Sequence, residues 1–195
     1  IIYYMKYKLQ LTQAKKVLCQ SKADLPKALK IKMVELLFEM KELKKSFGIF
    51  VILGWRKKWQ KYADTPDISQ DIFALHIINI MNIKHEEQRN KIIKTMNFDG
   101  AILIDRAGNV LHSGAMIEGL RPRATANKVN PGKSADLSTQ FGFRIKVHMR
   151  HIAAITSSHL FKNTTVFTIS EETNDFHIFE NGKIIYSTVH SEPTT

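Results

Sequence analysis

The sequence is poor in cysteine. Cys19 is the only one among 195 residues, so an intramolecular disulfide and a zinc site built on cysteines are both excluded. A chain of this kind is typical of a reducing compartment, and we expect a cytoplasmic location. We also expect no secretory signal, because the opening Ile-Ile-Tyr-Tyr-Met run is short and has no cleavage-like segment after it.

Long hydrophobic runs are missing as well. The longest continuous apolar stretch covers the nine residues Phe47–Trp55, whereas a membrane-spanning helix needs about 20 residues. We therefore expect no membrane span in this chain, and we interpret the run as a buried strand.

Acidic residues are scarce relative to basic ones. The chain has 29 Lys and Arg against 18 Asp and Glu, which gives a formal charge of +11. A surplus of this size favours polyanionic partners such as nucleotides, nucleic acid or an anionic membrane surface, without choosing among them. With 44% apolar and 24% charged residues, the composition is otherwise that of an ordinary globular chain with a buried core.

Apolar residues at helical spacing predict five helices. Asp24 is a candidate N-cap for the second of them, before Pro26 in its first turn, and Asp67 or Ser69 is a candidate N-cap for the third. The expected helices cover residues 3–22, the segment from the cap at Asp24 through Met33 to about Ser46, and residues 69–81, 85–96 and 150–161.

Short β-rich runs bounded by turn residues predict strands between and after these helices. Asn181-Gly182 is the strongest hairpin signal in the chain, and Ala107-Gly108 is a second one. A basic, aromatic loop covers Trp55–Tyr62, and a long basic connection covers residues 119–148. The mixture predicts an α/β (α+β) fold, with a mixed central β-sheet flanked by helices. The expected strands cover residues 48–53, 101–105, 109–113, 164–169, 176–179 and 183–186.

Three short segments contain the candidate functional residues. Asp99-Gly100-Ala101 precedes a strand, Arg150-His151-Ile152 opens a helix, and Ser170-Glu171-Glu172-Thr173 follows a strand. A carboxylate beside a small-residue backbone can reach a phosphate-bound Mg²⁺, which usually takes one or two carboxylates plus phosphate oxygens. Arg and His at a helix start add donors to a positive dipole end, an arrangement that suits a triphosphate.

In this order and on these elements, the segments resemble the diadenylate cyclase domain. That family is marked by an Asp-Gly-Ala motif, an Arg-His-Arg motif and often a Ser-Glu-Glu-Thr segment. The resemblance covers residues 33–187, which we expect to form a diadenylate cyclase-like nucleotide-binding domain. Residues 1–32 fall outside it as an N-terminal helical extension, and residues 188–195 form a tail.

The resemblance implies an enzyme that binds ATP with Mg²⁺ or Mn²⁺. In the family, two domains face each other as a homo-oligomer. The 3′-hydroxyl of each ATP attacks the α-phosphorus of the other, so that two pyrophosphates and cyclic di-AMP are released. A nucleic-acid partner is not expected from this resemblance.

The family's functional residues carry over to matching positions. Asp99 would bind the metal and help to activate the 3′-hydroxyl, and Glu172 would be the second metal ligand. The remaining expected nucleotide-binding residues are Gly100 and Ala101 for ribose and phosphate, Met116 and Ile117 for adenine, and Arg150, His151 and Ser170 for phosphate.

One motif departs from the family pattern. Ile152 stands where the second Arg belongs, and His148-Met149 replaces a Gly-Thr pair. The loss of a charge-assisted contact costs about 1.5–3 kcal/mol of binding. Cations in the 119–148 segment could replace that contact. The departure leaves a second interpretation open, a catalytically inactive relative that senses a nucleotide. The replacement candidates are Arg121, Arg123, Lys128, Lys133, Arg144 and Lys146.

A third interpretation is a basic nucleic-acid-binding module. It depends on the aromatic and basic residues of Trp55–Tyr62, which no further nucleic-acid-binding signature accompanies. Pro131-Gly132-Lys133-Ser134 ends like a phosphate-binding loop, but Asn127 stands where the first Gly belongs and no strand precedes it. We reject that loop as a nucleotide site.

Overall fold

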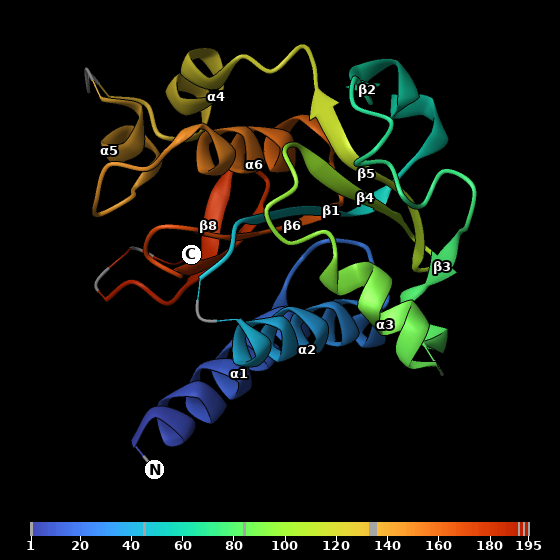
Figure 1. The fold of residues 1–195 in the computed structure, drawn as a ribbon. Coiled ribbons are helices and arrows are strands. Elements are labelled where there is room, and N and C mark those ends of the chain that lie inside the picture. Colours follow the sequence, from blue (N-terminus) through green and yellow to red (C-terminus); the bar gives the residue numbers. More distant parts are fainter. Residues whose placement is uncertain are drawn as a thin grey trace.

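Eight strands form one mixed sheet in the part of the chain that the structure describes (Figure 1). A computed structural model describes residues 2–44, 46–83, 85–132 and 136–190, together with Glu192 and Thr194. The strand order is β2-β5-β4-β1-β6-β7-β8, and β3 pairs with β5 outside this path. The strands are β1 (Ile49–Trp55), β2 (Ala63–Asp64), β3 (Ile78–Asn79), β4 (Ala101–Asp105), β5 (Asn109–Ile117), β6 (Thr165–Ile169), β7 (Phe176–Glu180) and β8 (Lys183–Ser187).

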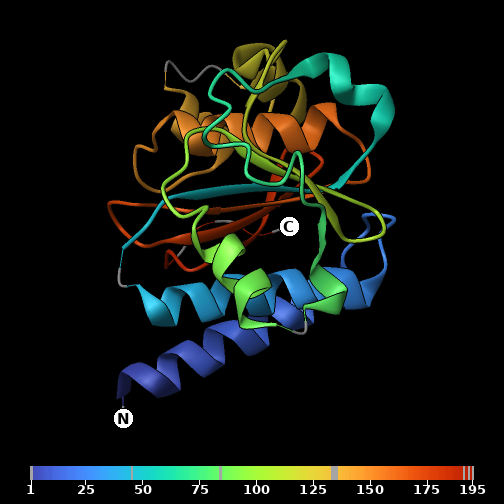
Figure 2. The same cartoon turned by 45° about the vertical axis from the view of Figure 1, so that its right-hand side comes forward.

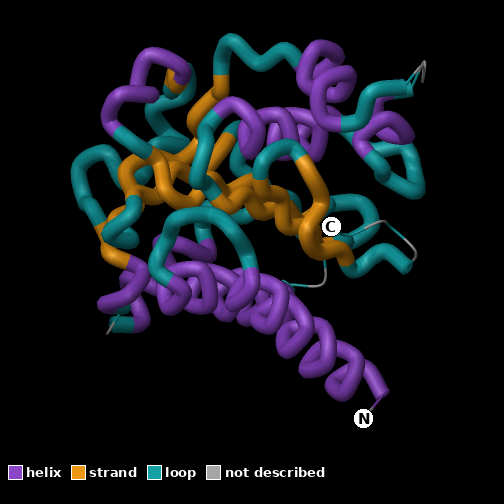
Figure 3. Tube along the Cα trace, turned by 180° about the vertical axis from the view of Figure 1, so that it is seen from behind, coloured by secondary structure: helices purple, strands orange, loops and turns teal. Residues whose placement is uncertain are grey.

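Helices cover both faces of this sheet (Figure 2). α1, α2 and α3 lie on one face, and α4, α5 and α6 lie on the other, so that the strands form the middle of three layers (Figure 3). None of the helices in the described ranges is long and apolar enough to cross a bilayer. The helices are α1 (Ile2–Gln20), α2 (Lys27–Leu43), α3 (Glu86–Ile93), α4 (Pro122–Val129), α5 (Leu137–Phe141) and α6 (Met149–Leu160), with 3-10 helices η1 (Lys57–Tyr62) and η2 (Ile80–Asn82).

The alternation of side chains along the strands builds a core on each face. In β1, Val51 and Leu53 pack with α1 and α2, whereas Phe50 and Ile52 pack with α6. All seven residues of β1 are buried, as expected of a central strand covered on both sides. The predicted fold class is therefore confirmed, and β1 is the strand expected from the apolar run.

The N-terminal extension packs on the rest of the chain. Tyr7 of α1 meets Phe38 edge to face at 5.1 Å between ring centroids. The Tyr186 hydroxyl of β8 donates to the carbonyl of Gln10 at 2.9 Å. α2 begins at Lys27 after Pro26, which occupies the N-cap position expected for Asp24. The expected boundary between residues 32 and 33 falls inside α2, and the division into extension, domain and tail stays a prediction.

The predicted helix over residues 69–81 is wrong. Successive amides here donate only three residues back, as in Gln70 to Asp67 and Asp71 to Ile68. Ile78 and Asn79 instead form β3, paired with Val110 and Asn109 of β5. The apolar spacing through Ile72, Leu75, Ile78 and Ile80 or Met81 was misleading, because Leu75 is 89% exposed and Met81 is 43% exposed. Tertiary pairing with β5 outweighs local helix propensity.

Two other segments differ from expectation. The connection over residues 119–148 contains α4 and α5, and α5 is capped by Asp136, whose side chain accepts from the Thr139 amide at 2.8 Å. The basic, aromatic segment forms η1 after β1, which extends through Trp55. Trp55 is buried, and Trp59 packs against Phe161 with 5.1 Å between ring centroids. These two indoles therefore belong to the α6 side of the core.

Candidate functional site

The parallel pairing of β1 with β4 places the Asp-Gly-Ala segment at one sheet edge. Val51 lies opposite Ile102 in this register. Just before β1 and β4, Gly48 lies beside Asn97: the Asn97 amide donates to the Gly48 carbonyl at 2.8 Å, and Asn97 Oδ1 accepts from the Gly48 amide at 2.6 Å. The starts of two adjacent parallel strands thus meet at the same edge of the sheet.

The antiparallel pairing of β1 with β6 brings the Ser-Glu-Glu-Thr segment to the same edge. Ile49 lies opposite Ile169, so the next pair along the strands is Gly48 with Ser170. The hydroxyl of Ser46 donates to the carbonyl of Glu171 and ties the two chain segments together beyond the strands. The segment around Ser46 and Gly48 is therefore bonded to Asn97 on one side and to Glu171 on the other.

The third segment reaches this edge from α6. A Cβ at Gly48 would overlap the Arg150 guanidinium, so this side chain lies directly on the Gly48 backbone. Arg150 is the second residue of α6, and the N-cap His148 makes no side-chain capping bond. The guanidinium and the positive end of the helix dipole therefore lie together at the sheet edge, which favours an anion.

A pocket opens beside the start of α6. Its volume is about 400 Å³. The structure brings four of the sequence-predicted residues into its wall, namely Arg150, His151, Ser170 and Glu172. Other lining residues include Lys146, His148, Asp175 and His177. Lys146 is the one replacement cation among the described candidates that lines the pocket, and Lys133 lies outside the described residues.

The other predicted residues, Asp99 among them, lie just before or in β4 or at the end of β5, and they do not line this pocket. Ala101 pairs with Ala115. Gly100 has a φ of +85°, and a Cβ there would lie 2.6 Å from the Ala115 carbonyl oxygen, so only glycine fits. Met116 is 49% exposed, and Met116 and Ile117 pair with the short strand β2. They form a separate group at the end of β5.

His151 is not the cation that its place in the motif indicated. Its side chain is 5% exposed, and its Nε2 has no hydrogen-bond partner among the described residues. Burial, helped by the nearby His177 and Arg150, lowers the pKa of His151 from 6.5 to about 3. Near neutral pH this imidazole is uncharged. Ile152 is also buried, as expected, so Arg150 supplies the charge of this motif.

The sequence did not single out His177, which lines the pocket, or its partner Glu192. His177 of β7 has its Nε2 2.8 Å from Oε2 of Glu192, and its ring lies 5.1 Å from that of His151. Ser187 Oγ and the Arg144 amide also donate to this carboxylate, at 2.6 and 3.0 Å. Burial acts to raise the pKa of Glu192, but hydrogen bonds from His177 and Ser187 outweigh it and lower the net pKa.

No sequence signal marks this pair. His177 has no motif around it, and Glu192 lies in the segment expected to be a tail. Its burial follows from long-range contacts with β7, β8 and the segment before α6.

The two predicted metal ligands, Asp99 and Glu172, are both carboxylates near the surface. In the described part of the chain, no group of three or more His, Cys, Asp or Glu side chains is placed to bind a metal alone. Asp99 is exposed, and Glu172 accepts from His148 Nε2 at 3.1 Å, also near the surface. Mg²⁺ often takes one or two carboxylates and leaves its other positions to water and substrate phosphates. Such a donor set suits Mg²⁺ or Mn²⁺ bound with a nucleotide.

The fold is similar to that of a known enzyme. DacA from Staphylococcus aureus, a diadenylate cyclase solved as a double mutant, matches with a TM-score of 0.51 and 18% identity over 83% of this chain and 87% of that chain. A hypothetical membrane spanning protein from Bacillus cereus matches over 94% of this chain and 92% of that chain, with a TM-score of 0.45 and 13% identity. No protein-family model and no curated protein matches the sequence. The likeness to DacA shows a diadenylate cyclase-like fold.

Proposed function

We propose that this protein is a diadenylate cyclase, which condenses two ATP molecules into cyclic di-AMP and two pyrophosphates. One observation supports the proposal above the others: the Arg150 guanidinium lies on the Gly48 backbone, which is bonded to Asn97 of the segment leading to Asp99 and precedes the strand paired with β6, after which Ser170 follows. An exposed carboxylate, a guanidinium and a helix N-terminus together suit a nucleoside triphosphate with a divalent cation. The diadenylate cyclase-like fold supports the same assignment.

In this proposal the triphosphate binds in the pocket beside α6. Arg150 offers planar, paired donors that match phosphate oxygens, Ser170 offers a hydroxyl, and Lys146 adds a second positive charge to the wall. His151 is neutral, so it adds no positive charge to this wall. Gly100 and Ala101 line the ribose and phosphate path, and Met116 and Ile117 at the end of β5 contact adenine.

The chemical step needs a proton acceptor. The 3′-hydroxyl of one ATP attacks the α-phosphorus of the other, the new phosphodiester bond forms, and pyrophosphate leaves as the old bond breaks. We assign the removal of the hydroxyl proton to the Asp99 carboxylate. Asp99 and Glu172 would hold the Mg²⁺ or Mn²⁺, which neutralises phosphate charge when bound. One chain holds one ATP, so two chains must face each other.

A nucleotide sensor without catalysis is the second candidate. It is favoured by the burial of both His151 and Ile152, which leaves Arg150 as the only charged member of the Arg-His-Ile segment. Such a site can still bind a nucleotide through Arg150 and Lys146 but has fewer charges to stabilise a transition state.

The dependence of specific activity on enzyme concentration tests whether the reaction needs two facing chains. We expect purified protein with ATP and Mn²⁺ or Mg²⁺ to form cyclic di-AMP, with a specific activity that rises as dilute enzyme becomes more concentrated, because each turnover needs two facing chains. Mass spectrometry measures the product. A specific activity independent of concentration, with the protein monomeric in sedimentation, contradicts the paired-site mechanism. The sensor interpretation predicts a nucleotide-dependent rise in unfolding temperature without product. If neither product nor shift is seen, both interpretations are wrong.

Gly48 allows a sharper test of Arg150. Gly48→Ala adds a methyl group where the guanidinium now lies, and the flexible Arg150 side chain must move. We expect ATP affinity to fall roughly tenfold, close to the loss from Arg150→Ala, because a charge-assisted contact is worth about 1.5–3 kcal/mol. Calorimetry measures the affinity. Gly132→Ala, at a site with open space around it, is the matched control. Unchanged affinity in Gly48→Ala would show that Arg150 does not bind the nucleotide in this position.

A further inference from the structure

The turn at Asp99 is held by a side chain from outside the three motifs. The Asp99 amide donates to Oε1 of Gln70 at 2.8 Å. The neighbouring carbonyl on the sheet edge, that of Gly48, already accepts from the Asn97 amide at 2.8 Å. The Asp99 amide therefore donates its hydrogen bond to a side chain of the segment before β3, which crosses the sheet edge at this point.

Gln70 is itself fixed at three places. Its Nε2 donates to Oδ2 of Asp67 at 3.0 Å, and its carbonyl accepts from Ser113 Oγ at 2.5 Å. Its Cβ packs over Gly114, where an added Cβ would lie 2.7 Å away. Because both ends of the amide have partners and the stem rests on β5, Oε1 is held toward the Asp99 amide.

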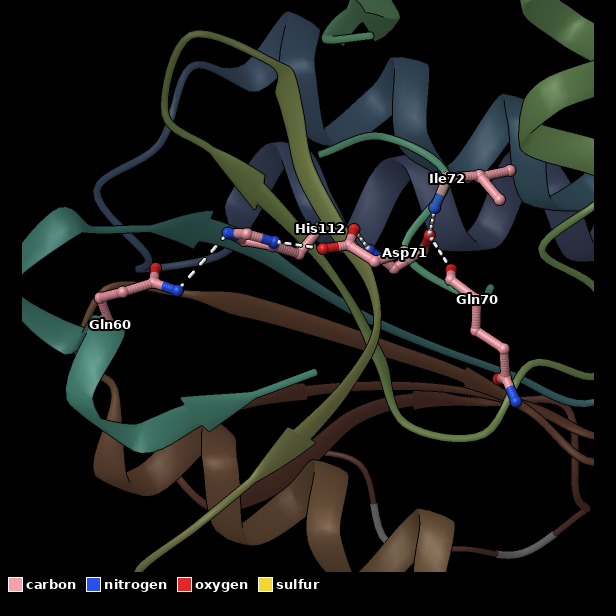
Figure 4. A network of polar contacts seen from close by, with 6 residues as sticks. Gln60, Gln70, Asp71, Ile72 and His112 are labelled. Carbon is pink, nitrogen blue, oxygen red and sulfur yellow. Dashed lines mark hydrogen bonds and ion pairs between the residues drawn. The ribbon is translucent and has the colours of Figure 1, made fainter. Parts of the chain in front are cut away.

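A buried carboxylate anchors the same segment to β5 (Figure 4). Oδ1 of Asp71 accepts from the Ser113 amide at 3.1 Å, and its Oδ2 lies 2.8 Å from Nδ1 of His112. The Ile72 amide donates to Ser113 Oγ at 3.2 Å. The Asp71 side chain is only 6% exposed. The chain of contacts ends at Gln60 of η1, whose Nε2 lies 3.4 Å from Nε2 of His112.

We propose that Gln70 is a positioning residue for the reaction, which sets the orientation of Asp99 through its backbone amide. This inference rests on the proposed function, since it concerns the residue assigned there as the proton acceptor. A carboxylate that must meet a hydroxyl gains from a fixed backbone, because displacement of about 1 Å can cost up to 100-fold in rate. The turn needs such support because Gly100, the next residue, has a positive φ of +85° and no side chain to hold it.

The rival account is that Gln70 only stabilises the fold. A structural role predicts a lower unfolding temperature and parallel losses in all activities. A positioning role predicts a lower kcat with little change in the KM for ATP, because Asp99 keeps its carboxylate and the assigned phosphate contacts lie around the start of α6 and just after β6. These two outcomes are separable in one set of variants.

Gln70→Met tests the proposal, since it keeps the length of the side chain over Gly114 and removes the acceptor. We expect kcat for cyclic di-AMP formation to fall roughly tenfold, with KM within twofold. Asp67→Asn/Gln70→Glu exchanges donor and acceptor and keeps an oxygen for the Asp99 amide, so it should restore most of the activity. Gln60→Ala, at the far end of the network, is the control and should behave as wild type.

Hydrogen exchange gives a readout that does not need catalysis. The Asp99 amide should exchange faster in Gln70→Met than in wild type and Gln60→Ala, as measured by NMR. Unchanged exchange, or a fall in kcat that the double variant does not rescue, overturns the positioning role. If the wild-type protein makes no cyclic di-AMP, the proposed function is wrong. The hydrogen-exchange measurement still shows in that case whether Gln70 holds the Asp99 amide.

Discussion

Asp99→Asn is expected to abolish cyclic di-AMP formation while the fold is retained. Asn has the same shape but cannot accept the 3′-hydroxyl proton, and loss of such a group typically costs about 10²–10⁴-fold in rate. The exposed side chain contributes no core packing, and its amide keeps the bond to Gln70. The unfolding temperature without nucleotide should therefore stay within about 2 °C, since surface changes are worth about 0.5 kcal/mol or less.

The same substitution tests the metal assignment. ATP binding in the presence of Mn²⁺ should weaken in Asp99→Asn and in Glu172→Gln, and the difference should shrink when the metal is removed by chelation. Calorimetry with and without metal measures both effects. Asp24→Asn, which removes an exposed carboxylate paired with Arg106, is the control. Metal-independent ATP affinity that is equal in all variants would contradict a shared ion, and full activity of Asp99→Asn would contradict its role as proton acceptor.

Local sequence signals predicted six strands of the sheet and missed the two short strands β2 and β3. The turn at Asn181-Gly182 has φ values of +52° and +79°, which suit the left-handed conformations that this dipeptide favours in hairpins. β1 was recognisable because a central strand that is buried on both faces must be continuously apolar. These features depend on the nearest neighbours in the chain, so a single sequence contains them.

Features set by distant partners were missed. The segment around Asp71 reads as a helix, yet its hydrogen bonds go to Ser113 and His112 of β5. No residue within the segment signals that choice, because the partners lie about 40 residues away in the chain. The missed Gln70 contact with Asp99 has the same cause.

The candidate site contains both kinds of feature, those set by neighbouring residues and those set by distant partners. Arg150 and Ser170 line one pocket, whereas Asp99, Gly100 and Ala101 lie outside its lining, so the site made from all three segments stays a prediction. The charge of His151 was misjudged, since a histidine at a helix start looks exposed in sequence. The burial of His151 is visible only in the structure, where Phe143 and His177 pack against its ring. The ring centroid of Phe143 lies 6.0 Å from that of His151.

That burial makes the stability of the protein depend on pH. His151 has a folded-state pKa of about 3 against an ordinary 6.5. Below pH 6.5 the unfolded chain binds a proton that the folded chain rejects, so stability is fully present above this pH and is lost as the pH falls toward 3. At roughly 1.4 kcal/mol for each pKa unit, the expected loss between pH 6.5 and pH 4 is about 3 kcal/mol of unfolding free energy.

Denaturant unfolding across this pH range measures the effect. Arg150 and His177 oppose a charge on His151, Glu192 favours one, and burial outweighs them all. His151→Phe removes the titrating group and keeps an aromatic ring beside Phe143, so its unfolding free energy should fall less steeply with pH. His151→Leu serves the same purpose if the larger ring disturbs packing. His76→Asn, at an exposed position, should keep the wild-type slope. An unchanged slope in both His151 variants would mean that the imidazole is hydrated in solution, and it would restore His151 as a cation for the phosphate pocket.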